Sequence, residues 1–375
     1  MPEPIRVGIV GANPIRGWAL GSHLPPLQAL PGFELVAVAT RHQESAAETA
    51  GRFGVAHAFG DPAELIAHPD VDLVTISVKV PHHHALTRAA IEAGKHVFCE
   101  WPLGANTGEA VDLLDLATER GVRHVIGLQG RRSPMVNYVK HLVADGYVGE
   151  LVYALLSIEG AGRGGEIGAD REWTTDDANG VGMLKIIGGH SLDVLRYIVG
   201  DLTEVQADVA VRYPEVTVIE TGARIPVTSP DVVLAHGRLS GGAFVSVAIQ
   251  GGLPKGFGAR LEIHGTDGVL VIASGAGALH VSDVGLRLSG ASGEAKVEPM
   301  TVPDRYQTVP DGVPDTAARN VAGLYLTLAT AIERGDDPAL LEPSFGTAVE
   351  LHRVLDEITA ASRSGGRRSL GPAAG

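Results

Sequence analysis

A glycine-bearing turn near the start of the chain has the residue types of a phosphate-binding loop. It runs from Gly11 to Gly17 and contains Ala12, Asn13, Pro14, Ile15 and Arg16. Backbone N–H groups in such a turn, with the N-terminus of the next helix, can hold a pyrophosphate. Asn13 takes the place of the second glycine of the usual G-x-G-x-x-G spacing, and tolerates left-handed backbone angles better than most residues. The alternative is a structural turn without a ligand.

The next candidate contacts follow the strand that residues 35–39 predict. They are Thr40 and Arg41. NAD-binding folds usually carry an acidic residue here, which binds the ribose hydroxyls. No acid is present here. Arg41 could instead pair with a 2′-phosphate, and Thr40 could donate a hydrogen bond to it, so these residues favour NADP over NAD. A solvated arginine after a strand is the alternative interpretation.

A lysine and three histidines follow the strand predicted over residues 71–78. Lys79 lies just after this strand, and His82, His83 and His84 open a predicted helix. Adjacent helical residues point about 100° apart, so three of them cannot converge on one ion. We therefore predict no metal site and expect one of them, His83, to face a cofactor.

The predicted elements that position these residues alternate in type through the first half of the chain. Further strands are predicted over residues 5–10, 96–99 and 125–129, and helices over residues 18–30 and 107–120, the last with Thr107 as its cap. Alternating strands and helices indicate a doubly wound parallel sheet. Later strand-like runs span residues 150–156, 205–211, 232–239, 243–249, 260–264 and 269–272. Amphipathic patterns predict helices over residues 180–199, 320–334 and 347–362.

We predict two domains with these ranges: 1–130 binds a dinucleotide, and 131–375 binds the substrate. The C-terminal helices are expected to pack back onto the body, and residues 364–375 to form a mobile tail. The formal charge of −14 argues against a nucleic-acid or acidic-membrane partner. The single cysteine, Cys99, lies in a strand-like run and is predicted to be a core residue. No leader or membrane span is predicted, so we expect a soluble, cytoplasmic protein.

Four landmarks together resemble the Gfo/Idh/MocA family of oxidoreductases. They are the glycine turn, the run 93–97 leading to Glu100-x-Pro102, Arg131 three residues before Pro134, and the run 188–193 (Gly-Gly-His-Ser-Leu-Asp). The resemblance implies a Rossmann domain followed by an α/β domain with a large open, mostly antiparallel sheet. One face of that sheet often forms a subunit interface in this family, so we expect a homodimer or homotetramer.

The resemblance also implies where the ligands lie. Expected cofactor contacts are Gly11, Asn13, Pro14, Ile15, Thr40, Arg41, Val78, Lys79, His83, Glu100, Trp101 and Gln129. Expected substrate contacts are Trp101, Arg131, Trp173, His190 and Asp193. Trp173 lies in a glycine-rich segment, residues 160–180, which we interpret as a lid or as a disordered loop with one anchoring aromatic.

Two departures from the family pattern affect the catalytic prediction. The lysine of the family's Glu-Lys-Pro motif is replaced by Trp101, and the aspartate four residues before the histidine by Ile186. Both changes occur in the branch that resembles the fungal galactose-pathway repressors. Only His190 of the usual set remains, and its ordinary pKa near 6.5 suits proton transfer. The alternative for it is a satisfied buried histidine.

Two other residues have candidate roles in the reaction. Lys79 is a candidate for the positive charge lost at Trp101, or a lysine bonded to Glu100 or a cofactor phosphate. Asp193, three residues after His190, could orient the imidazole or bind a sugar hydroxyl, or could bond to the domain hinge. We predict an NAD(P)-dependent oxidoreductase of a sugar, cyclitol or related polyol. The alternatives are a non-catalytic dinucleotide-binding regulator and redox-assisted glycoside cleavage with a recycled cofactor.

Overall fold

The structure is a computed structural model that describes residues 3–161, 164–253, 255–256, 258–275, 278–335 and 341–371. The chain divides into two compact units. Unit 1 comprises Met1–Arg132 and Thr308–Val349, and unit 2 comprises Ser133–Gln307 and Glu350–Gly375. Unit 1 therefore includes a segment from beyond residue 300 that the predicted range 1–130 leaves out.

Unit 1 contains the predicted doubly wound parallel sheet. Its six strands, in the order β3-β2-β1-β4-β5-β6, all pair in parallel. They are β1 (Ile5–Val10), β2 (Phe33–Ala39), β3 (His57–Phe59), β4 (Leu73–Ile76), β5 (His96–Cys99) and β6 (His124–Ile126). The central strands are apolar and buried along most of their length, as parallel strands covered on both faces must be. Cys99 is fully buried, as predicted.

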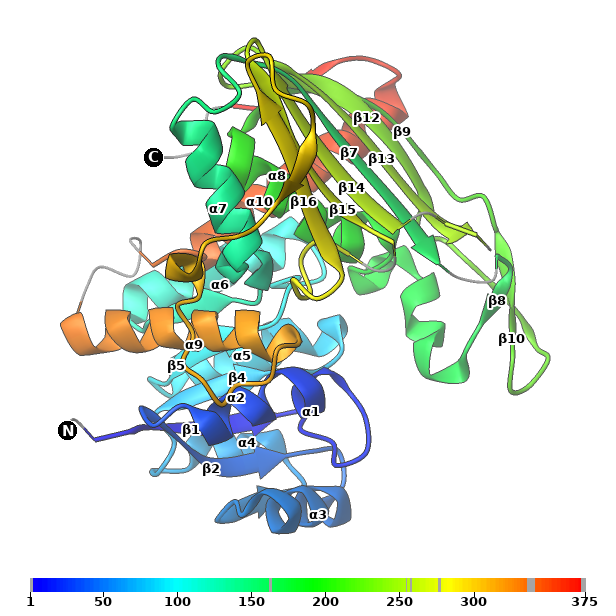
Figure 1. The fold of residues 1–375 in the computed structure, drawn as a ribbon. Helices are drawn as coiled ribbons and strands as arrows, with labels where there is room; N and C mark the ends of the chain where they lie inside the picture. Colours follow the sequence, from blue (N-terminus) through cyan, green and yellow to red (C-terminus); the bar gives the residue numbers. More distant parts are fainter. Residues whose placement is uncertain are drawn as a thin grey trace. The chain divides into compact units, whose positions relative to one another are not determined.

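The helices of unit 1 differ from the prediction at their ends. They are α1 (Trp18–Ser22), α2 (Leu24–Ala29), α3 (Gln43–Phe53), α4 (Pro62–Ala67), α5 (His83–Glu92), α6 (Thr107–Arg120) and α9 (Ala317–Arg334), with short 3₁₀ turns η1 (Val80–His82) and η2 (Gln129–Arg132). The predicted helix over residues 18–30 is interrupted at His23. The cap of α6 is Asn106 rather than Thr107, because its side chain accepts a hydrogen bond from the Glu109 N–H over 3.0 Å. Figure 1 shows α9, in orange, beside α1 and α2.

Unit 2 is built on a nine-stranded sheet in the order β17-β16-β15-β14-β7-β13-β12-β9-β18. Its strands are β7 (Leu151–Ala161), β9 (Leu202–Ala210), β12 (Val232–Leu239), β13 (Phe244–Leu253), β14 (Gly258–Gly265), β15 (Gly268–Ser274), β16 (Leu286–Ser292), β17 (Glu298–Met300) and β18 (Arg368–Ser369). Only β7 and β13 pair in parallel; all other neighbours are antiparallel. The predicted large open, mostly antiparallel sheet is therefore confirmed.

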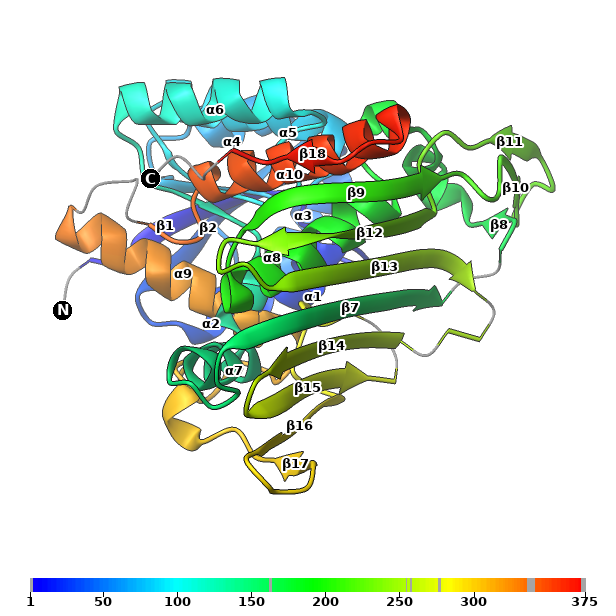
Figure 2. The same ribbon diagram turned by 90° about the horizontal axis from the view of Figure 1, so that it is seen from above.

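Helices lie along one face of this sheet. They are α7 (Pro134–Ala144), α8 (Gly189–Val199), which a π-helix, η5 (Met183–Gly188), precedes, and α10 (Phe345–Ser364). Figure 2 looks onto the other face, with α8 behind the strands and α10, in red, beyond β9. Along β12 the side chains alternate: Val233 and Ala235 are buried, whereas Leu234 is 45% exposed. This alternation is expected of a sheet covered on one side only.

Two segments predicted to lack structure contain short elements. The predicted mobile tail includes β18, which pairs with β9, and the Leu370 N–H donates to the Thr203 carbonyl over 2.8 Å. The predicted lid contains β8 (Glu166–Ile167) and 3₁₀ turns η3 (Ala169–Thr175) and η4 (Asp177–Asn179), and β8 joins β10 (Glu215–Val218) and β11 (Arg224–Pro226) in a small sheet.

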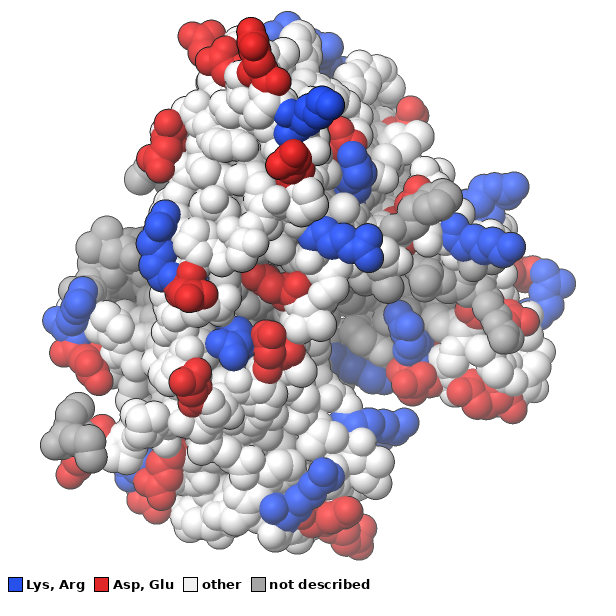
Figure 3. All heavy atoms as spheres, in the orientation of Figure 1, with Lys and Arg blue, Asp and Glu red and all other residues white. Residues whose placement is uncertain are grey.

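No helix within the described residues is both long and apolar enough to cross a membrane. On the face drawn in Figure 3, basic and acidic side chains are interspersed.

Candidate functional site

The glycine turn follows β1 at the carboxyl edge of the parallel sheet. Gly11 has a φ of 103°, and a Cβ atom there would overlap the Ser77 carbonyl oxygen. Its N–H donates to the Ala39 carbonyl over 2.8 Å. The turn therefore lies against the ends of β2 and β4, which is where doubly wound sheets bind their ligands.

Asn13 stabilises the turn through its side chain. Its Oδ1 atom accepts hydrogen bonds from the N–H groups of Ile15, over 3.0 Å, and Arg16, over 3.1 Å. The residue is not in the left-handed region, since every positive φ in the described part of the chain belongs to a glycine. The tolerance of asparagine for left-handed angles is therefore not used here: the side chain closes an Asx turn instead. Two amides that could face a pyrophosphate are already bonded within the protein.

Helix α3 holds the turn from the other side. The buried Thr49 hydroxyl donates to the Ala12 carbonyl over 2.8 Å, and Arg52 Nη1 donates to the Pro14 carbonyl over 2.6 Å. Ile15, at the tip, is 76% exposed. The turn is thus fixed at its base and open at its tip.

The residues after β2 divide into one that is bonded and one that is free. The Thr40 hydroxyl donates to the His42 carbonyl over 2.9 Å and lies 2.6 Å from Ser45 Oγ. A hydroxyl carries a single proton, so this one is already used locally. Arg41 is exposed, and its guanidinium has no hydrogen-bond or ion-pair partner among the described residues. Arg41 is therefore the group here that a phosphate could bind.

Glu100 belongs to a buried polar chain that the sequence analysis missed. Its Oε1 atom lies 2.9 Å from His23 Nε2, and His23 Nδ1 lies 2.9 Å from the Tyr325 hydroxyl. The Tyr325 hydroxyl in turn lies 2.9 Å from Thr75 Oγ1, and burial raises its pKa. Such a satisfied network fixes the Glu100 carboxylate at the end of β5. No pattern in the sequence indicated this chain of hydrogen bonds.

His83 lies inside unit 1, between the predicted cofactor contact Val78 and Pro102, which follows the predicted contact Trp101. Its Nδ1 atom lies 2.7 Å from the Pro102 carbonyl oxygen and its Nε2 atom 3.1 Å from that of Val78. Burial lowers the pKa of His83, so the ring is neutral and donates to one of the two. His83 would act on a cofactor through Val78 and Pro102 rather than by facing it.

The other residues near this edge of the sheet have varied surroundings. Trp101 is only 5% exposed, and the Trp101–Pro102 peptide bond is cis. Lys79 is exposed at the start of η1. His84 bonds to Asp112 over 2.7 Å, whereas His82 is exposed, so the three adjacent histidines have separate environments.

Gln129 and Arg131 follow β6 in unit 1. Gln129 is 1% exposed, and its buried Oε1 atom has no hydrogen-bond partner among the described residues. Buried acceptors are nearly always satisfied, so this atom fits a ligand that supplies an N–H or O–H donor. Arg131, the predicted substrate contact, pairs with Glu342 over 2.5 Å.

His190 stacks on a second histidine, His280, within unit 2. The ring centroids are 4.1 Å apart and the rings are parallel to within 1°. Both side chains are buried, and neither Nδ1 atom has a hydrogen-bond partner among the described residues. Burial, and then the neighbouring His280, lower the pKa of His190 well below its usual value. His280 has no sequence signal: it is a lone histidine in a glycine-rich segment.

The π-helix η5, which precedes α8, changes where Ile186 lies relative to His190. Ile186 lies in η5, whose wider turn displaces it from the α-helical face that His190 would share with a residue four positions earlier. Asp193 is buried on α8. Trp173 lies in η3, and its carbonyl accepts a hydrogen bond from Asn179 Nδ2 over 2.8 Å.

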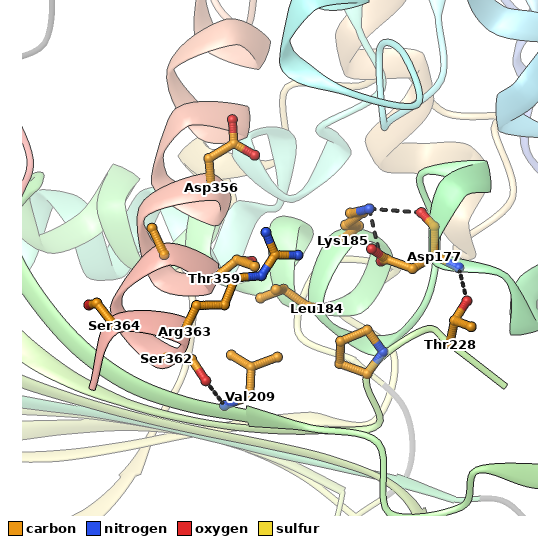
Figure 4. Close-up of a pocket in the computed structure, with 12 residues that line it drawn as sticks. Asp177, Leu184, Lys185, Val209, Thr228, Asp356, Thr359, Ser362, Arg363 and Ser364 are labelled. Atoms are coloured by element: carbon orange, nitrogen blue, oxygen red, sulfur yellow. Dashed lines mark hydrogen bonds and ion pairs between the residues drawn. The ribbon is translucent and has the colours of Figure 1, made fainter. Parts of the chain in front are cut away.

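A separate cavity of about 720 Å³ lies in unit 2 beside α10, η5 and β9. Figure 4 shows Arg363 of α10 beside Leu184, while Lys185 bonds to Asp177 over 2.9 Å. None of the predicted site residues is among its twelve described lining residues.

The described residues of unit 1 fit a pyridine dinucleotide. The turn permits close approach at Gly11, Arg41 is available for a phosphate, and the Gln129 acceptor lacks a donor. These groups lie near the carboxyl ends of β1, β2 and β6, where such folds bind dinucleotides.

Comparison with known proteins agrees with this architecture. Residues 5–128 match the oxidoreductase family with an NAD-binding Rossmann fold, Gfo/Idh/MocA, and residues 134–274 match the C-terminal domain of Gal80p. The chain is 33% identical over 311 residues to the galactose/lactose metabolism regulatory protein GAL80 of Saccharomyces cerevisiae, which covers 76% of this chain and 71% of that protein. A crystal structure of a Gal80p super-repressor mutant from the same yeast superposes with a TM-score of 0.86, at 25% identity, over 98% of this chain and 97% of that one.

A dehydrogenase of sugars is also similar. The levoglucosan dehydrogenase of Pseudarthrobacter phenanthrenivorans is 29% identical over 299 residues, covering 72% of this chain and 73% of that protein. A levoglucosan dehydrogenase structure in complex with NADH and L-sorbose shares the fold, with a TM-score of 0.83 at 22% identity over 99% of this chain and 100% of that one. The chain belongs to the Gfo/Idh/MocA oxidoreductase family, in the branch whose C-terminal domain is that of Gal80p.

Proposed function

We propose that the protein is an NAD(P)-dependent oxidoreductase that acts on a sugar, cyclitol or related polyol, with NADP as the preferred cofactor. The observation that carries this proposal is the turn at Gly11, where no side chain fits against Ser77. A backbone pressed this closely onto the sheet edge leaves room for a pyrophosphate at its tip. The sugar-acting relative supports the substrate class.

Arg41 supports the preference for NADP. Its guanidinium is exposed beyond β2, at the position where NAD-binding folds place an acidic residue. A planar guanidinium binds phosphate oxygens through two parallel N–H groups. The Thr40 hydroxyl can donate to a phosphate only if its hydrogen bond to the His42 carbonyl breaks.

His190 is the proposed proton-transfer residue. A bound nicotinamide would supply the hydride acceptor for a substrate carbon. The neutral His190 imidazole would take the proton from the substrate hydroxyl as the hydride is transferred. Its lowered pKa keeps the ring in the neutral form that can accept a proton, and its buried Nδ1 atom has no hydrogen-bond partner among the described residues. Lys79 is the proposed source of positive charge near the developing alkoxide.

The test is a turnover assay of the purified protein with NAD⁺ and NADP⁺ against a panel of sugars, cyclitols and polyols. We expect nicotinamide reduction with at least one substrate, faster with NADP⁺. Tight NADP⁺ binding without turnover on the panel would reject the enzymatic proposal and leave the cofactor proposal standing.

A non-catalytic regulator is the second candidate. The observations in its favour are Trp101 and Ile186, which replace the family's lysine and aspartate, and the similarity to GAL80. A stoichiometric protein partner whose affinity changes on adding dinucleotide would support it. Redox-assisted glycoside cleavage would instead release sugar without net reduction of the cofactor, and sugar analysis of the same reactions distinguishes it.

We also propose a homodimer or homotetramer that uses the open face of the nine-stranded sheet. Leu234 and Phe244 expose 45% and 52% of their area there. Exposed apolar side chains on one sheet face are typical of subunit interfaces. Light scattering of the full chain tests this, and Phe244→Glu should shift the mass toward a monomer.

A further inference from the structure

We propose that His57, His68 and Asp70 form a binding site for a divalent transition metal at the β3 edge of the unit 1 sheet. One ligand atom from each of these residues lies within 4.8 Å of the other two. This group is separate from the glycine turn and from the adjacent histidines 82–84, for which we predicted no metal. From the sequence we predicted no metal site anywhere in the chain, and this group was missed because β3 and α4 were not expected.

The three side chains converge from separate elements. His57 starts β3, His68 follows α4, and Asp70 lies in the loop before β4. His57 Nε2 is 3.5 Å from Asp70 Oδ2, and His68 Nδ1 is 4.0 Å from the same oxygen. Ligands of one tetrahedral zinc, each about 2.1 Å from the ion, lie about 3.4 Å apart. The site therefore needs only small side-chain rotations to close around an ion.

Neighbouring groups position the ligands in the way that metal sites require. Asp70 directs Oδ1 toward Arg6 Nη1, 3.3 Å away, and Oδ2 toward the two imidazoles. Lys95 Nζ donates to the carbonyls of His68 and Val71, which fixes the loop. Such outer contacts orient the first ligands and tune their affinity.

The surroundings also show what an ion must displace. The Nδ1 atom of His68 accepts a hydrogen bond from the Asp70 N–H over 3.2 Å, so the metal competes with one long bond for a single lone pair. The two rings already pack at a centroid distance of 4.2 Å, with Phe59 5.6 Å from His68. His57 and His68 remain partly exposed, which gives an ion a route in.

The ligand atoms favour a late first-row transition metal such as zinc over magnesium or calcium. Two imidazoles and one carboxylate suit Zn²⁺, Co²⁺, Ni²⁺ or Cu²⁺, whereas hard cations prefer oxygen ligands only. Three protein ligands leave one position open to water. The site belongs to unit 1 alone, and its existence does not depend on the proposed oxidoreductase activity.

The test titrates Co²⁺ and Zn²⁺ into the full chain after dialysis against a chelator. We expect one equivalent of Co²⁺ to give the visible absorption of a tetrahedral site, and Zn²⁺ to bleach it. The variants His57→Ala, His68→Ala and Asp70→Asn should each weaken Zn²⁺ binding by about tenfold or more. His82→Ala removes an exposed histidine outside the group and should leave binding unchanged.

A second measurement separates loss of the site from loss of folding. Zn²⁺ should raise the unfolding temperature of the wild-type protein, since an ion that binds only the folded state stabilises it. Each variant should unfold cooperatively in chelator, and its unfolding temperature should not rise with Zn²⁺. Absence of saturable binding in the wild type, or unchanged binding in the double variant H57A/H68A, would overturn the proposal.

Discussion

In unit 1 the predicted ligand contacts are fixed by backbone geometry, whereas in unit 2 the predicted proton-transfer residue is fixed by burial against a second histidine. Gly11 admits no side chain, and α3 holds its turn by two hydrogen bonds. His190 has no hydrogen bond at Nδ1 and is positioned by its helix and by His280. The glycine turn of unit 1 is thus held by backbone constraints, whereas His190 of unit 2 is held by packing.

The difference shows which part of a family's chemistry can change without the fold changing. A pyrophosphate site depends on where the chain turns, which few residues besides glycine allow. Proton transfer depends on side chains, and at the two positions where the resemblance implies lysine and aspartate this chain has Trp101 and Ile186. Variants in unit 1 therefore test cofactor binding, and variants at His190 in unit 2 test proton transfer.

Removing the proposed base should have the largest effect. With any substrate that the turnover assay identifies, His190→Asn should lower kcat by about 10²–10⁴-fold, the usual contribution of a positioned acid–base group. The dissociation constant for NADP⁺ should stay within about twofold, because His190 is not a predicted cofactor contact. Steady-state kinetics and calorimetry on the same preparation check both values, and His141→Asn, at an exposed position on α7, is the control.

The second effect is on the turn. Gly11→Ala places a methyl group on the Ser77 carbonyl oxygen at a φ of 103°, so we expect a loss of about 2 kcal/mol or more in unfolding free energy. NADP⁺ binding should be lost in the fraction that remains folded. Gly21→Ala, where no atom lies near the added carbon, should be close to neutral in urea unfolding. Wild-type NADP⁺ affinity in the folded Gly11→Ala protein would show that the turn does not bind it.

Buried histidines should make the protein sensitive to acid. Burial lowers the pKa of His280 to about 3 and that of His124 to about 4, from an ordinary 6.5. These rings are neutral when folded and take up protons when unfolded, so their contribution to stability is present above pH 6.5. It is lost as the pH falls from 6.5 toward the folded values, by about 1 kcal/mol per pH unit for each ring.

A variant isolates one of these contributions. His280→Phe keeps an aromatic ring beside His190 and removes the titrating group, so the urea midpoint should fall less steeply between pH 6.5 and 4 than in the wild type. Identical pH slopes in both proteins would contradict the role given to His280.

The smallest effect concerns cofactor choice. Arg41→Ser should weaken NADP⁺ binding by about tenfold to a hundredfold, the range for one lost charge-assisted bond, and leave NAD⁺ binding unchanged. Arg353→Ser removes an exposed arginine on α10 and serves as the control. Equal losses for both cofactors would show that Arg41 does not read the 2′-phosphate.

The sequence predicted the layered architecture well because its signals are local. Apolar runs predicted most strands of both sheets, and the predicted range 232–239 matches β12 at both ends. The glycine turn was predicted from the spacing of its residues. The short elements β3 and α4 were missed because three to six residues carry too little periodicity. Their absence hid the group formed by His57, His68 and Asp70.

The contacts of the candidate site were less predictable because they are made across the sequence. The bonds from Glu100 to His23 and from His23 to Tyr325 join residues 77 and 302 positions apart. Asn13 was recognised as a departure, but its side-chain bonds to Ile15 and Arg16 depend on the closed turn. The stacking of His280 on His190 has no local pattern at all.

The most direct test is a crystal structure of the protein with NADP⁺. The account predicts density for the pyrophosphate along the turn from Gly11 to Ile15 and for the 2′-phosphate against Arg41. A dinucleotide bound elsewhere, or crystals without it under conditions where calorimetry shows saturation, would contradict the claim that this turn is the cofactor site.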